Sequence, residues 1–75
     1  MIIGVPKEIK TREYRVGLVP AGAKAFIGSN HQVFVEKGAG EGAGISDAEY
    51  ERVGAKIVNS ADDLWKRSEM IIKVK

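Results

Sequence analysis

The chain has 75 residues, of which 44% are hydrophobic and 29% are charged, so one globular domain is expected and extensive disorder is excluded. Its 12 basic and 10 acidic residues are interspersed, and the net charge of +2 does not provide the clustered basic surface of a nucleic-acid-binding protein. The chain contains no Cys, which excludes disulfides, thiolate catalysis and thiolate metal sites.

The N-terminus carries no targeting or membrane signal. Charge begins at Lys7, so the basic leader and apolar run of a signal peptide are missing. No apolar run approaches the roughly 20 residues that a membrane-spanning helix needs. We therefore expect a soluble protein without a membrane partner, and the lack of Cys is compatible with the cytoplasm.

The chain begins with an apolar segment, predicted to be a strand, and charged residues follow it directly. Residues 1–5 are apolar or Gly, as in a strand buried on both faces, and Pro6 ends it because proline lacks a ladder donor. A connection dense in Lys, Arg and Glu follows over residues 7–16. Ligands of open parallel α/β sheets bind at the carboxyl ends of the strands, so this connection is a candidate site.

Apolar spacing and capping residues predict three short helices. They begin at Pro20, at the Ser46–Glu49 capping box and at Ser60. Their inward faces are expected to be formed by Ala23, Phe26 and Ile27, then by Tyr50 and Val53, and then by Ala61, Leu64 and Trp65. The first helix is expected to stop at residues 28–30, and Gly54 closes the second.

Four strands are expected to alternate with these helices. They cover residues 1–5, 32–36, 56–58 and 70–74. This alternation predicts an α/β fold with a parallel sheet and right-handed crossovers, the N-terminal part of a Rossmann-like or flavodoxin-like domain. Such sheets usually have more strands, so we interpret the chain as the N-terminal piece of a larger protein.

The glycine run of residues 38–44 partly fits a dinucleotide fingerprint, since Gly38, Gly40 and Ala43 match G-x-G-x-x-A. That fingerprint must open a helix directly, whereas the helix signal here is Ser46, three residues too late. The fingerprint also needs an acidic residue at the end of the next strand to bind the ribose hydroxyls, and Asn59 occupies that position. We interpret the run as a glycine loop that lines a cleft and expect no cofactor-binding residue in this chain.

His31 is the sole histidine and could in principle act as a general base. It precedes a strand and should lie at the edge opposite the strand carboxyl ends, so a surface or capping role is expected instead. No second His or carboxylate has a ligand-like spacing to it, and we predict no metal site.

Arg15 and Lys75 are the strongest pair of candidates for a binding site. Arg15 ends the connection after the first strand and Lys75 ends the last strand, so both can project at one carboxyl edge. A guanidinium matches a carboxylate in two parallel hydrogen bonds, and an ammonium can polarise a carbonyl oxygen. The pair would suit a 2-oxo acid such as pyruvate, although exposed Arg and Lys are usually only solvated charges.

Several blocks together resemble the start of the alanine dehydrogenase family. These blocks are MIIGVPKEIK, EYRV, PAG, VEKGAG, AEYERVGAKIV, SADDLW and IIKVK, and they cover essentially the whole chain. The resemblance implies NAD-linked oxidative deamination of L-alanine to pyruvate and ammonia. It also implies that Arg15 holds the substrate carboxylate and that Lys75 contacts its carbonyl or amino-bearing end. The transhydrogenase alpha subunit shares this pattern, and saccharopine dehydrogenases share it more distantly.

Two positions depart from the family pattern. Val19 stands where Thr is usual before Pro20, which removes a capping hydroxyl worth about 1 kcal/mol. Asn30 stands where Gly is usual, and Asn tolerates a left-handed turn. Neither position belongs to the expected site, so both concern stability.

The resemblance places the catalytic histidine and aspartate and the NAD-binding domain beyond residue 75. Residues 1–75 would therefore form the N-terminal part of the substrate-binding domain, with no catalytic residue of their own, and would be inactive alone. The expected partners are pyruvate or L-alanine, the remainder of the polypeptide, and further copies in a cytoplasmic homo-oligomer. The alternatives are a transhydrogenase alpha subunit, against which the K-V-K ending argues, and a stand-alone α/β interaction module.

Overall fold

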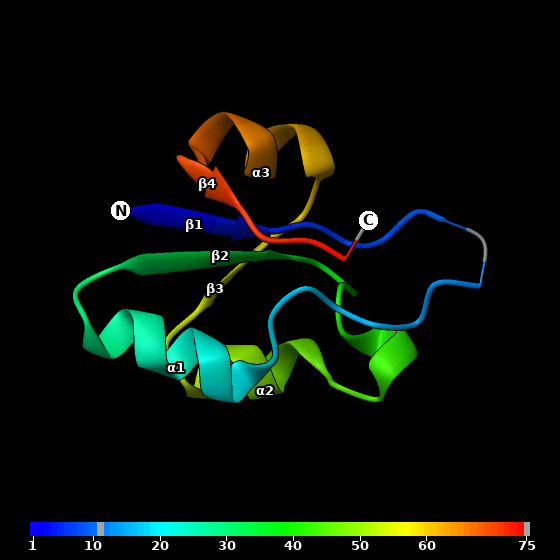
Figure 1. Ribbon diagram of the computed structural model, residues 1–75, viewed down its shortest axis with the longest axis horizontal. Helices are drawn as coiled ribbons and strands as arrows, with labels where there is room; N and C mark the ends of the chain where they lie inside the picture. The colour runs from blue at the N-terminus through cyan, green and yellow to red at the C-terminus, as the bar shows by residue number, and fades with distance from the viewer. Residues whose placement is uncertain (11, 75) are drawn as a thin grey trace.

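The computed structural model describes residues 1–10 and 12–74, and its centre is a parallel four-stranded sheet (Figure 1). The strands are β1 (Ile2–Val5), β2 (Gln32–Glu36), β3 (Lys56–Val58) and β4 (Met70–Ile71). Their order across the sheet is β3-β2-β1-β4. Rossmann-type sheets begin with this order, whereas the flavodoxin order would place β1 between β2 and β3. The α/β parallel fold is therefore confirmed, in its Rossmann form.

The helices cover both faces of the sheet. Helices α1 (Pro20–Gly28) and α2 (Asp47–Arg52) lie together on one face, and α3 (Ala61–Arg67) lies on the other (Figure 1). A short 3-10 turn, η1 (Glu41–Ala43), follows β2. The chain changes face after β3, and the switch point between β1 and β4 is where such sheets bind ligands.

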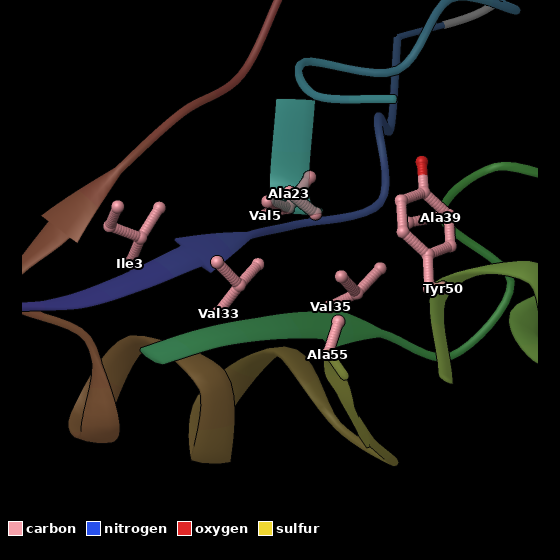
Figure 2. Packing of buried hydrophobic residues seen from close by; sticks show 8 residues of the cluster. All are labelled: Ile3, Val5, Ala23, Val33, Val35, Ala39, Tyr50 and Ala55. Atoms are coloured by element: carbon pink, nitrogen blue, oxygen red, sulfur yellow. The ribbon is translucent and has the colours of Figure 1, made fainter. Parts of the chain in front are cut away.

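Alternating side chains of the strands build two apolar clusters. The larger cluster lies under α1 and α2 and consists of Ile3, Val5, Ala23, Val33, Val35, Ala39, Tyr50 and Ala55 (Figure 2). The smaller cluster lies under α3 and consists of Phe34, Val58 and Leu64, with Ile2 packed against it. Because β1 and β2 contribute to both clusters, the strand predicted to be buried on both faces is confirmed.

The helix ends follow the capping residues of the sequence. Ser46 accepts a hydrogen bond from the N–H of Glu49, whose carboxylate accepts one from the N–H of Ser46, so the predicted capping box is present. Val19 occupies the N-cap of α1 without a side-chain cap, as its lack of a hydroxyl requires. Asn30 has a φ of 70°, the left-handed turn that Asn tolerates.

The inward face predicted for the third helix is wrong at two of its three positions. Leu64 is fully buried, but Trp65 is 50% exposed and Ala61 is also exposed. The sheet is covered instead by Arg67, whose guanidinium lies 5.9 Å from the ring centroid of Phe34, and by Ser68, which lies over Gly4. The helix is therefore turned so that Leu64 and the positions three and four residues later face the strands.

The last strand is shorter than the predicted residues 70–74, because β4 ends at Ile71. The N–H of Ile72 still donates to the carbonyl oxygen of Gly4 over 3.0 Å. The next rung of a parallel ladder would need an N–H from Pro6, which proline lacks. Pro6 therefore ends both β1 and its pairing with the C-terminal segment.

Tyr50 connects α2 to the segment that precedes α1. Its side chain is fully buried and its hydroxyl donates a 2.7 Å hydrogen bond to the carbonyl oxygen of Leu18. Burial, with smaller contributions from the charges of Glu49 and Asp47, raises the pKa of Tyr50 to about 12 from the ordinary 10.0. The folded chain therefore keeps the phenol protonated at pH values where the unfolded chain ionises it.

This difference predicts a loss of stability in alkali. The contribution of Tyr50 is complete below pH 10.0, the unfolded pKa, and is lost as the pH rises toward about 12, the folded pKa. Urea unfolding between pH 9 and pH 12 should show a steeper fall in the free energy of unfolding than for Tyr50→Phe, since Lys titration is common to both. Parallel pH curves for the two proteins would contradict this prediction.

Candidate functional site

Arg15 lies at the carboxyl edge of the sheet, in the connection between β1 and α1. Its side chain is 70% exposed and faces a cavity of about 240 Å³. The cavity is lined by Lys7, Glu8, Glu13, Tyr14, Arg15, Gly38, Ala39, Glu41 and Gly42. These residues come from the segments that follow β1 and β2, so the cavity lies where parallel α/β sheets place their ligands.

Arg15 is held by the carboxylate of Glu13, two residues before it. Oε2 accepts hydrogen bonds from the backbone N–H and from Nε of Arg15, over 3.1 and 3.0 Å, and Oε1 accepts one from Nη2 over 3.1 Å. These bonds to Glu13 are the main reason that the pKa of Arg15 is raised, and the charge of Glu8 adds to the effect. The guanidinium therefore stays charged at every physiological pH.

Two close backbone approaches fix the loop that carries Arg15. A Cβ on Gly42 would lie 3.1 Å from the Cα and the carbonyl oxygen of Tyr14, so the glycine run packs against the loop on one side. A Cβ on Gly17 would lie 2.5 Å from the carbonyl oxygen of Ile72 and 2.7 Å from the Cα of Lys73. The loop thus lies between the glycine run and the segment that follows β4.

The segment after β4 is tied to the segment after β1 by Glu8. Its Oε2 accepts a 2.8 Å hydrogen bond from the N–H of Val74. Figure 1 shows the C-terminal segment running beside the chain that leaves β1. Lys75, the second predicted site residue, lies outside the described residues. Among the described residues, the segment after β4 meets the loop of Arg15 at Gly17 and the segment after β1 at Glu8.

The glycine run does not provide a pyrophosphate cradle. Gly38 donates its N–H to the carboxylate of Asp47 over 2.9 Å. The N–H of Ala39 donates to the carbonyl oxygen of Glu36, and the N–H groups of Glu41, Ala43 and Gly44 donate to carbonyl oxygens within the run. Helix α2 begins only at Asp47, and Gly40 is packed against Ile45 and Tyr50. The residues present therefore do not fit a dinucleotide, while Gly38 and Gly42 line the cavity of Arg15.

His31 lies at the opposite edge of the sheet, just before β2. Its Nδ1 is 3.2 Å from the N-terminal ammonium, and its ring packs edge-on against Phe26 with centroids 6.0 Å apart. These contacts join the N-terminus to the end of α1. They are local contacts of the kind predicted for a surface histidine.

A second, larger cavity of about 560 Å³ lies beside α3 at the same carboxyl edge. It shares Lys7 and Glu8 with the cavity of Arg15 but has apolar walls that include Ile9 and Trp65. Ile9 is 93% exposed and Trp65 is half exposed. We assign the candidate binding site to the smaller cavity, because it contains the paired guanidinium.

The described part of the chain contains neither a membrane-spanning helix nor a metal-binding cluster. Within residues 1–10 and 12–74, no helix is both long and apolar enough to cross a bilayer. Over the same residues, no group of three or more His, Cys, Asp or Glu side chains could hold a metal ion.

Residues 4–75 match the protein family described as "Alanine dehydrogenase/PNT, N-terminal domain". The chain belongs to this family. Alanine dehydrogenases from Methanococcus maripaludis and Bacillus subtilis are 53% and 49% identical to it over 75 residues. Each match covers 100% of this chain and 20% of the relative, so the chain spans about a fifth of the length of its curated relatives.

Solved structures of the family have the same fold. An L-alanine dehydrogenase matches with a TM-score of 0.93 and 51% identity, over 97% of this chain and 20% of that protein. A transhydrogenase from Sinorhizobium meliloti matches over the same shares, with a TM-score of 0.88 and 36% identity. The transhydrogenase is the more distant of the two in both measures, which favours the alanine dehydrogenase branch.

Proposed function

We propose that this chain supplies the substrate-binding N-terminal part of an NAD-dependent alanine dehydrogenase. In this proposal Arg15 binds the carboxylate of L-alanine or pyruvate, and Lys75 contacts the carbonyl or amino-bearing end. The observation that carries it is Arg15 itself, a paired guanidinium facing a cavity at the carboxyl edge of the sheet, between the segments that follow β1 and β2. A guanidinium fork at this edge suits a small carboxylate.

The proposal assigns hydride transfer to the remainder of the polypeptide. NAD would be bound there, since the glycine run of this chain does not fit a dinucleotide. The chain would then contribute binding and orientation of the substrate, which a dehydrogenase needs to bring the reacting carbon against the nicotinamide. We place the complete enzyme in the cytoplasm, as a homo-oligomer.

A chimaera tests this proposal. The 75 residues replace the matched fifth of the Methanococcus maripaludis alanine dehydrogenase, to which they are 53% identical. We expect the chimaera to reduce NAD in the presence of L-alanine with kcat/KM within about tenfold of the parent enzyme. A segment that lacked the substrate-binding residues would lower kcat/KM by more than tenfold.

The matched control replaces the same fifth by the corresponding segment of the Sinorhizobium meliloti transhydrogenase, the more distant relative. We expect this control to lose alanine-dependent activity. A folded chimaera with this chain that is as inactive as the control would contradict the proposal, and comparable activity in both would show that the segment does not specify the substrate.

A further inference from the structure

Glu13 and Arg15 differ sharply in their exposure. The side chain of Glu13 is only 7% exposed, whereas that of Arg15 is 70% exposed. The acid is therefore anchored in the loop and the guanidinium extends from it. An ion pair with so exposed a member adds little to stability, so its effect on the orientation of Arg15 is the more important one.

The geometry of the pair leaves one edge of the guanidinium for a ligand. A guanidinium has five N–H donors, and Glu13 uses one on Nε and one on Nη2. Nη1 has no hydrogen bond to any residue that the structure describes. The Nη1–Nη2 edge can therefore still form two parallel hydrogen bonds with a second carboxylate.

The hydrogen bond from the backbone N–H of Arg15 to Glu13 further restricts the direction in which the guanidinium points. The same Oε2 that accepts from Nε also accepts from the backbone N–H of Arg15 over 3.1 Å. One carboxylate thus links the start and the tip of the arginine side chain, which restricts its rotamers. Gly42 packs against the backbone of the loop at Tyr14, and Gly17, within the loop, packs against the segment after β4, so the loop that carries both Glu13 and Arg15 is held on two sides.

We infer that Glu13 is the positioning residue of the site: it holds the Nε–Nη2 edge of Arg15 and turns the Nη1–Nη2 edge toward the substrate carboxylate. This inference rests on the proposed function of Arg15 and deepens it. Glu13 itself touches no substrate atom in this arrangement. The opposite possibility, that Glu13 competes with the substrate for Arg15, predicts the reverse change in KM and is separated by experiment.

A double-mutant cycle in the chimaera tests the inference, with pyruvate, ammonia and NADH as substrates. Glu13→Ala is expected to raise the KM for pyruvate about tenfold with a smaller change in kcat, because a misdirected guanidinium binds its ligand less well. Glu13→Gln keeps one acceptor oxygen in nearly the same shape but sets an NH2 group against the other guanidinium N–H, so its KM should lie between those of the parent chimaera and Glu13→Ala. In the Arg15→Ala background, Glu13→Ala should have no further effect.

The matched control is Asp63→Ala. Asp63 also pairs with Nε of an arginine, Arg67, over 3.2 Å within α3 and does not line the cavity of Arg15, so its loss should leave the KM for pyruvate unchanged. An unchanged or lowered KM in Glu13→Ala would overturn the inference, as would an equal rise with and without Arg15. An unchanged KM in Arg15→Ala alone would instead refute the proposed function, so the two failures are distinguishable.

Discussion

Replacing Arg15 by Ala in the chimaera is expected to raise the KM for pyruvate and for L-alanine by about 100-fold, the equivalent of two charge-assisted hydrogen bonds at about 1.5 kcal/mol each. The change should fall mainly on KM. Arg15 would contact the carboxylate, which keeps its charge throughout the reaction, so it binds substrate and transition state about equally. Steady-state kinetics in both directions measure the effect.

Two variants sharpen this experiment. Arg15→Lys keeps the charge but loses the fork, and its KM should lie between those of the parent chimaera and Arg15→Ala. Arg12→Ala removes an equal charge from the same loop at a residue that does not line the cavity. Its KM should not change. If Arg12→Ala and Arg15→Ala behave alike, the effect is one of general charge and the assignment of Arg15 is wrong.

Replacing Gly17 by Ala is expected to damage both stability and activity. The new Cβ would lie 2.5 Å from the carbonyl oxygen of Ile72, and a backbone atom cannot rotate away as a side chain can. The loop and the C-terminal segment must separate, which should lower the free energy of unfolding by about 2 kcal/mol. Because the shift moves Arg15 relative to that segment, we also expect a loss of about tenfold or more in kcat/KM.

The matched control for this substitution is Gly28→Ala at the end of α1. A Cβ there would meet no heavy atom within 4 Å, so stability and kinetics should stay close to those of the parent chimaera. Urea unfolding and steady-state kinetics of the two variants give the comparison. Equal stability of Gly17→Ala and Gly28→Ala would show that the close approach of the two segments is unimportant.

Local sequence signals predicted most of the fold. The strands at residues 32–36 and 56–58 have the predicted bounds, and the helices after Pro20 and Ser46 begin where their capping signals lie. These features depend on neighbours along the chain. The face of α3 did not follow from the apolar pattern. That pattern predicts that Trp65 faces the sheet, but the side chains that face it are those of Leu64, Arg67 and Ser68.

The candidate site was predicted less completely than the fold. Sequence reasoning placed Arg15 at the carboxyl edge, where the structure has it, but its role remains a prediction, and Lys75 lies outside the described residues. It missed Glu13 because a buried carboxylate two positions away looks the same as a solvated one in a charged loop. It also missed Gly17, whose neighbours lie far away along the chain, although this glycine directly follows the EYRV block. The glycine run was predicted to line a cleft, and Gly38 and Gly42 do line the cavity.

The pairing of β1 with β4 determines when this edge can form during folding. The N–H of Ile2 donates to the carboxylate of Glu69, 67 positions away, so these strands join the two ends of the chain. Closing a loop of this length costs somewhat more chain entropy than closing the shorter loop between β1 and β2, and pairings of longer range form more slowly. The β1–β2 unit can assemble as soon as the first half of the chain is available. We therefore expect the part of this edge that contains Val74 to form after the β1–β2 unit, because it needs the pairing of β1 with β4.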